Sequence, residues 1–203
     1  MLLREYNQRK HIKESEIELV IHHIPIGILI AQYIHREKDI ATSAMAIMTG
    51  LYITDALSGF LHCFFDHYTG NIPVLRDEAR IFQEHHIPPY KINESAISVA
   101  LHNAIIIPPP ILSAYVNYKY RVPSYIIIGE IVVLYGLYMS DFVHGLCHDK
   151  RDNRFVKWLR KRHVILDKQT HLTHHETLNS NYCMLNGWAN PFVNSLCNIW
   201  TNK

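Results

Sequence analysis

The chain has 203 residues, enough for one domain with a sizeable core, and a formal net charge of +2 at pH 7. So small a charge argues against a nucleic-acid-binding surface, and we expect no nucleic-acid partner. The four cysteines form no C-x-x-C pair, which argues against a disulfide framework or a zinc ribbon, so we expect reduced thiols in the core. The polar first sixteen residues lack the short apolar stretch of a cleavable signal peptide.

Four apolar segments follow this polar segment 1–16, at about 17–34, 40–65, 96–118 and 122–147. Each has the length needed to cross a hydrocarbon core about 30 Å thick. The sequence therefore predicts one all-α domain over 17–203, an integral membrane four-helix bundle built from two helical hairpins. Because the mean hydropathy is near zero, a soluble bundle of buried helices is the alternative.

Lysine and arginine are distributed unevenly between the two ends of these spans. With the N-terminus in the cytosol, 16 of them lie in the inner segments 1–16, 66–95 and 148–203, and 4 in the outer turns. The positive-inside rule favours this orientation. Segments 66–95 and 148–203 would then form a cytosolic cap, on the side where the clustered histidines lie.

Eight of the fifteen histidines fall into tight clusters at the ends of spans or in this cap. Spacings of three or four residues place imidazoles on one helical face, where neutral rings can converge on a cation. Eight histidines exceed the ligands that one ion takes, and ligands without thiolate favour iron, zinc or manganese, here in two sites with open positions. The candidate metal-binding and catalytic residues are His62, Asp66, His85, His86, His144, His148, His171, His174 and His175.

The second and fourth spans end alike. YITDALSGFLH at 52–62 aligns without gaps to YMSDFVHGLCH at 138–148, so that Tyr, Asp, Gly and the terminal His recur. The same offset sets Asp66 opposite Asp152 and brings the two His-His pairs into similar places. A repeat predicts one metal-binding half-site from each hairpin, and a chance match between two apolar helices is the alternative.

Besides Glu18 at the start of the first span, three acidic residues lie within the spans. Asp55 and Asp141 come two helical turns before His62 and His148, and ionisable groups at that depth are costly unless paired or facing a polar cavity. We expect each to accept an N–H from a ligand imidazole or to be a simple interfacial aspartate. Glu130 lies in mid-span and is expected to hydrogen-bond across the bundle, with no catalytic role.

Two further segments carry structural signals. The proline triplet at 108–110 would break a helix, which predicts that the third span is kinked or enters and leaves the same leaflet. The run 150–163 interleaves Lys and Arg with apolar residues such as Phe155 and Trp158. It predicts an amphipathic helix on an anionic membrane surface, with a solvated basic helix as the alternative.

Five motifs stand out between about residue 54 and residue 200: DALSGFLHCFFD at 55–66, FQEHHIPPYKI at 82–92, HGLCH at 144–148, HVIL at 163–166 and HLTHHETLNSNYCMLNGWANP at 171–191. In this combination the chain resembles the Kua-type lipid desaturases, whose animal members are the plasmanylethanolamine desaturases. Where animal members have H-W-G-A-D-T-W-G, this chain has HCFFDHYTG at 62–70.

The resemblance implies a di-iron enzyme that uses O2 as co-substrate to desaturate a lipid. The eight ligand histidines of the family fall on the eight clustered histidines above, and Asp66 matches a further functional aspartate. For plasmanyl substrates the oxidised bond is the first of the sn-1 alkyl ether, which gives the vinyl ether of plasmalogens. An acyl-lipid desaturase or hydroxylase with the same site is the alternative, and a haem- or metal-binding membrane protein is the non-enzymatic one.

The resemblance also implies partners and a location. The substrate would be a membrane phospholipid or ether lipid, with its chain in an apolar cleft between spans and its headgroup near Tyr90 and Lys91. Electrons would come from an external donor such as cytochrome b5, because the chain has neither an H-P-G-G haem motif nor a G-x-G-x-x-G fingerprint. We expect a multi-pass protein of the endoplasmic reticulum with its active site facing the cytosol.

The remaining seven histidines receive lesser roles. His163 matches some family members only, and we expect it to support a ligand rather than to bind metal. Surface or packing roles are expected for His11, His22, His23, His35, His67 and His102.

Overall fold

The computed structural model describes residues 23–87, 108–149 and 152–201, and every regular element in these ranges is a helix. The prediction of an all-α chain is therefore confirmed for the described residues. In chain order the helices are His23–Ile34, α2 (Ile40–Asp66), α3 (Pro73–Glu84), α5 (Pro108–Tyr120), α6 (Ser124–His148), α7 (Arg154–Lys161), α8 (Lys168–Thr177) and α9 (Asn190–Thr201).

Helices α2 and α6 are long and apolar enough to cross a membrane, and their bounds lie within two residues of two predicted spans. The carboxylate of Asp39 begins α2 by accepting hydrogen bonds from the N–H groups of Ala41 and Thr42. Only 33% of the most apolar 18-residue stretch of α2 is buried, and only 17% of that of α6. Exposed large side chains such as Met45 and Phe142 are consistent with membrane association rather than with a soluble core.

Small residues let α2 and α6 pack closely along their length. A Cβ atom added to Gly50 would lie 3.0 Å from Cγ1 of Val132, and one added to Gly136 would lie 2.7 Å from Cγ2 of Thr54. Glycine at both positions therefore permits the close approach that membrane helices use in place of hydrophobic association. This contact fixes the two helices that carry candidate ligands at their ends.

The helix His23–Ile34 and α5 pack on the first half of α6. Leu29, Ala114 and Ile127 form a buried cluster, and the side-chain amide of Gln32 donates to the carbonyl of Ala114 at 2.9 Å. The predicted spans 17–34 and 96–118 are described only from residues 23 and 108 onward, so the complete four-span bundle stays a prediction. Helix α5 starts with the three prolines, at positions where a helix tolerates them, and the expected kink before them lies outside the described residues.

Glu130 bonds across the bundle, as expected. Its Oε2 accepts a hydrogen bond from the hydroxyl of Ser113 at 2.5 Å and one from the amide of Asn117 at 2.8 Å, which joins α6 to α5. Asn117 is fully buried, and its own carbonyl accepts from the guanidinium of Arg36 at 3.1 Å. Glu130 in mid-span therefore has a structural role, because its carboxylate links α6 to α5.

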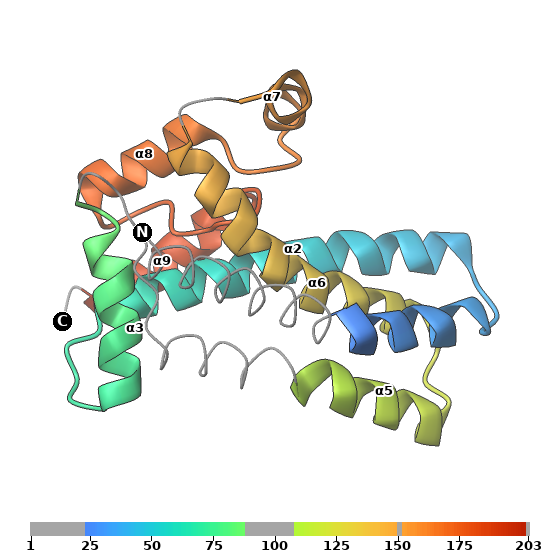
Figure 1. The fold of residues 1–203 in the computed structure, drawn as a ribbon. Coiled ribbons are helices and arrows are strands. Elements are labelled where there is room, and N and C mark those ends of the chain that lie inside the picture. The colour runs from blue at the N-terminus through green and yellow to red at the C-terminus, as the bar shows by residue number, and fades with distance from the viewer. Residues whose placement is uncertain (1–22, 88–107, 150–151, 202–203) are drawn as a thin grey trace, which may run out of the picture.

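Helices α3, α8 and α9 gather at the C-terminal end of α2, close to the end of α6 (Figure 1). The four cysteines are free and buried, as predicted. The helix predicted from the basic run is α7, which is shorter than expected and is capped by Asn153. Its Val156 and Leu159 pack on the core, whereas Phe155 and Trp158 are 65% and 50% exposed. Contact of this exposed face with a membrane stays a prediction.

Candidate metal centre

The nine candidate residues converge at the C-terminal ends of α2 and α6, where they form two groups. Within each group the potential ligand atoms, one from each residue, lie within 4.8 Å of one another. We call the first the carboxylate group and the second the all-histidine group. The carboxylate group contains His62, Asp66, His86 and His174, and the all-histidine group contains His85, His144, His148, His171 and His175.

Several pairs of ring nitrogens are spaced like neighbouring ligands around one cation. In the all-histidine group, Nε2 of His171 lies 2.9 Å from Nε2 of His148 and 2.9 Å from Nε2 of His175. In the carboxylate group, the Nε2 atoms of His86 and His174 are 3.1 Å apart. Two nitrogens bound at right angles, about 2.1 Å from a metal, would be about 3.0 Å apart. Ions placed among these atoms would therefore find ligand separations close to those they require.

Several buried polar atoms of the two groups have no hydrogen-bond partner. A buried polar atom left without a partner is costly, and native proteins contain few of them. Coordination to a cation would satisfy the atoms that face the group centres, so the residues present fit metal ions. The atoms without a hydrogen bond include Nε2 of His62, both carboxylate oxygens of Asp66 and Nε2 of His85. Oδ2 of Asp66 makes only ion-pair contacts, at 3.3 Å from Nε2 of His174 and 3.5 Å from Nε2 of His62.

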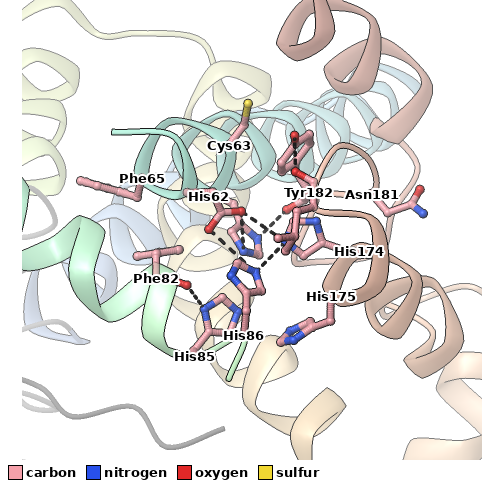
Figure 2. Close-up of polar contacts among 12 residues, drawn as sticks. His62, Cys63, Phe65, Phe82, His85, His86, His174, His175, Asn181 and Tyr182 are labelled. Carbon is pink, nitrogen blue, oxygen red and sulfur yellow. Dashed lines mark hydrogen bonds and ion pairs between the residues drawn. The ribbon is translucent and has the colours of Figure 1, made fainter. Parts of the chain in front are cut away.

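Backbone carbonyls orient three of the rings. Nδ1 of His62 lies 2.9 Å from the carbonyl oxygen of Tyr182, and Nδ1 of His174 lies 2.8 Å from that of Ser180. Nδ1 of His85 is bonded in the same way to the carbonyl of Phe82. With the proton on Nδ1, each ring keeps its Nε2 lone pair for a metal. Figure 2 shows His62, His86 and His174 pointing toward one another in this arrangement.

Four of the histidines outside the two spans are held in the neutral form that binds metal. Burial, reinforced by neighbouring histidines, lowers the pKa of His85, His86 and His175 to about 3. Burial also holds the pKa of His171 well below its usual value, with His144 as the largest further cause. At neutral pH these rings therefore need no deprotonation before they coordinate a cation.

The two consecutive histidine pairs are each divided between the groups. His85 and His175 belong to the all-histidine group, whereas their neighbours His86 and His174 belong to the carboxylate group. On α8, residues 171 and 175 are one helical turn apart and share a face, while residue 174 points to the other group. Both pairs thus bridge the two groups and fix them beside each other.

The predicted half-site from each hairpin agrees with the structure only for the spans. Helix α2 supplies His62 and Asp66 to one group, and α6 supplies His144 and His148 to the other. The His85-His86 and His174-His175 pairs each contribute one residue to each group, so the prediction of one half-site from each hairpin is wrong for these pairs. The repeat also fails at Asp152, which pairs with the side chains of buried Arg160 and of Lys168 at 3.1 Å each and belongs to neither group.

The expectation that Asp55 accepts a ligand imidazole N–H is wrong. Its carboxylate is fully buried and instead accepts hydrogen bonds from the backbone of the segment before α9. Asp141, its counterpart in the aligned motif, is exposed. The donors to Asp55 are the N–H groups of Leu185, Asn186, Gly187 and Ala189, at 2.9–3.2 Å.

Asp55 thereby contributes to the candidate site indirectly, by holding a backbone segment that is continuous with it. The segment that it binds begins just after Tyr182, whose carbonyl orients the ring of His62. Gly187 has a φ of +81°, a conformation that glycine adopts without strain and that lets the segment turn over the carboxylate. Sequence reasoning missed this role, and the G-W-x-N motif that contains Gly187 was the signal that could have indicated it.

The other described histidines lie outside both groups. His163 is exposed, and its carbonyl accepts the indole N–H of Trp188 at 2.9 Å, so the expected support by its ring has no counterpart among the described contacts. His67 is bonded to the carbonyl of Cys63 and packs near Tyr182, which confirms a packing role. Surface positions are confirmed for His23 and His35, whereas His11, His22 and His102 lie outside the described residues.

Comparison with known proteins gives one match. A family model described as the lipid desaturase domain matches residues 51–202, a region that contains all nine candidate ligands. No curated protein and no solved structure matches the chain. The match covers well over half of the chain and is consistent with the resemblance to Kua-type desaturases. The chain belongs to the lipid desaturase family.

Proposed function

We propose that this protein is a membrane di-iron desaturase that uses O2 to oxidise a membrane ether lipid to its vinyl ether. The family supports a lipid desaturase-type oxidoreductase. The observation that carries the finer proposal is the pair of adjacent ligand groups at one end of two long apolar helices. Such a position would let a bilayer lipid present its headgroup end to both metal ions.

The two groups suit metals with open coordination positions. Three histidines and one carboxylate leave two positions of an octahedral ion free, and five histidines leave one. When bound, two iron ions would supply the oxidising power needed to remove hydrogen from unactivated methylenes. A structural zinc ion would close its sphere with four ligands, which the all-histidine group exceeds.

The surrounding residues contribute orientation and exclusion of water. His62, His171 and His174 are at most 1% exposed, so bulk water does not reach these rings. The carbonyls of Tyr182 and Ser180 fix which nitrogen faces the metal. Asp66 adds a negative charge to one group only, which would lower the net charge of that metal site.

Electrons would come from an external donor such as cytochrome b5, and the protein would lie in the endoplasmic reticulum as a multi-pass protein. Cytosolic exposure of the site is supported by the lysine and arginine distribution. It is also supported by the position of both groups at the same ends of α2 and α6. A donor would then approach from the side of α3 and α8, where the ligand pairs lie.

The test is to express the protein in cells that contain plasmanyl lipids but make no vinyl ethers, and to profile their lipids. We expect a vinyl-ether product with the wild type and with His35→Ala, an exposed histidine outside both groups. His62→Ala, Asp66→Asn and His174→Ala should each abolish the product while the protein still accumulates in membranes. Purified protein should contain about two iron ions per chain and no haem absorption band.

Other outcomes identify the alternatives. A new acyl double bond would indicate an acyl-lipid desaturase, and a hydroxylated chain would indicate a hydroxylase with the same site. Haem absorption without lipid oxidation would indicate the non-enzymatic alternative. Retention of the product in all three ligand variants would overturn the proposal.

A further inference from the structure

An apolar cavity of about 650 Å³ opens between α2, α5 and α6, in the halves of α2 and α6 that carry no ligand. Its volume lies within the usual range for binding sites of small organic molecules, which is about 300–1,000 Å³. Its lining includes Met45, Ala46 and Ile53 of α2, Pro109 of α5, and Gly129 and Val133 of α6.

Two polar side chains of the wall bond to each other. Glu130 and Ser113 both line the cavity, and the Ser113 hydroxyl donates to the Glu130 carboxylate at 2.5 Å. The same carboxylate oxygen accepts from Asn117 of α5, outside the lining. Because this acid is engaged between helices, the surface left for a ligand is almost entirely hydrocarbon. A polar or charged ligand would lose its hydration without compensation there.

The distance from the ligand groups matches the length of a lipid chain. Ile53 precedes His62 by nine residues, and at 1.5 Å per residue the near end of the cavity lies about 14 Å along α2 from the metal end. Leu134 precedes His144 by ten residues, which gives about 15 Å along α6. One leaflet of a hydrocarbon core about 30 Å thick is about 15 Å deep. A chain held at the metals by its headgroup end would therefore reach the cavity.

From this geometry we propose that the cavity binds the methyl-terminal part of the substrate's hydrocarbon chain and selects chain length. This inference rests on the proposed function, because it places the reacting bond at the metal groups. A chain oxidised next to its headgroup has nearly its full length left to extend toward the cavity. A chain oxidised in its middle would end well before it.

Two small residues keep the cavity open. A Cβ atom added to Gly129 would meet only atoms of Ala46, at 3.8 Å, which is ordinary contact. Both residues line the cavity, so a larger side chain at either position would take up part of the lined space. At Gly50, the other glycine of the lining, an added Cβ atom would lie 3.0 Å from Cγ1 of Val132 and 3.1 Å from the carbonyl oxygen of Gly129. Of the two lining glycines, Gly129 is therefore the one at which a side chain can be added at lower cost to packing.

The experiment supplies cells with plasmanyl lipids of shorter and longer alkyl chains and compares the ratio of the two products. Ala46→Leu and Gly129→Leu should each shift this ratio about tenfold toward the shorter chain, as expected for added methylene groups in an apolar pocket. The matched control is Ala44→Leu, at the same depth on α2 but exposed and outside the lining. It should keep the wild-type ratio.

Two further measurements keep the inference separate from the proposed function. Val133→Ala enlarges the cavity and should shift the ratio toward the longer chain even if the larger side chains impair folding. The chain lengths of lipids that co-purify with each variant should shift in the same directions without any catalysis. An active wild type with unchanged ratios in all cavity variants would overturn the inference alone. A wild type that forms no oxidised lipid would overturn the proposed function, and co-purified lipids would still test the cavity.

Discussion

The C-terminal ends of α2 and α6 share four identical residues at identical spacing, yet these residues have different surroundings. Asp55 is fully buried and accepts four backbone hydrogen bonds, whereas Asp141 is exposed. A Cβ atom added to Gly59 would lie 2.8 Å from Sγ of Cys183, whereas one added to Gly145 would meet nothing within 4 Å. The end of α2 is enclosed by the C-terminal segment, and the same residues on α6 are not.

The difference shows which part of the repeated pattern concerns metal binding. The terminal histidines of both motifs, His62 and His148, belong to ligand groups. In α2 the aspartate and glycine before the histidine contact the C-terminal segment, whereas the aspartate and glycine of α6 are exposed. The two motifs therefore share only the candidate ligand histidine at the helix end. Whether the other matching residues have the same role must be tested for each pair.

The largest contrast is expected between Asp66→Asn and Asp152→Asn. The first change removes the only carboxylate of its group, so we expect lipid oxidation to fall more than about 100-fold, with loss of about one iron ion per chain. The second change weakens ion pairs of Arg160 and Lys168 and should lower stability while the folded protein keeps both iron ions. Product formation and iron content per chain measure both effects. Equal loss of iron in the two variants would contradict the division into groups.

Acid should destabilise the metal-free protein because the buried histidines of both ligand groups become protonated when the chain unfolds. The pKa values of His85, His86 and His175 are about 3 in the folded protein, below the ordinary value of about 6.5. The unfolded chain therefore binds more protons below pH 6.5, and stability falls as pH drops from about 6.5 toward 3. Unfolding midpoints between pH 7.5 and 5 should show uptake of at least about four protons at the acid end, from these three rings and from His171, whose pKa is also lowered. A midpoint independent of pH in this window would show that these rings are not buried as neutral groups.

Asparagine substitutions of Asp55 and Asp141 should differ in their effect on the free energy of unfolding rather than in their effect on metal content. In Asp55→Asn, an uncharged amide replaces a carboxylate that accepts four backbone N–H groups, and we expect a loss of about 3 kcal/mol in the free energy of unfolding. Asp141→Asn changes an exposed residue and should cost less than about 1 kcal/mol. Hydrogen exchange of residues 185–189 should accelerate only in the first variant. Similar exchange in both variants would refute the anchoring role of Asp55.

Much of the site could be predicted because its signals are local. All nine candidate ligands were indicated by spacings of one helical turn or by adjacent histidines, and the bounds of α2 and α6 followed from apolar length. The division of each histidine pair between two groups could not be predicted in this way. It depends on how α3 and α8 approach the ends of the spans, which no local spacing encodes.

The role of Asp55 is a second example of what sequence spacing leaves open. Its partners are more than 120 residues away and bond through backbone N–H groups, which have no side-chain identity to recognise. The carbonyls that orient His62 and His174 are invisible in the sequence for the same reason. The position of Asp55 in a span suggested a carboxylate that supports a candidate metal ligand. The structure shows instead that this carboxylate anchors the backbone of residues 185–189.

A contrast with opposite signs is expected between Gly59→Ala and Gly145→Ala. At Gly59 the added methyl group would overlap Cys183 and lie 3.1 Å from Val193, so overpacking of about 1–3 kcal/mol outweighs the helix propensity gained. At Gly145 nothing lies within 4 Å, and alanine should stabilise α6 by up to about 1 kcal/mol. Thermal midpoints of the two variants in one detergent measure the difference. Stabilisation of both would mean that the C-terminal segment does not pack on α2 as closely as the structure shows.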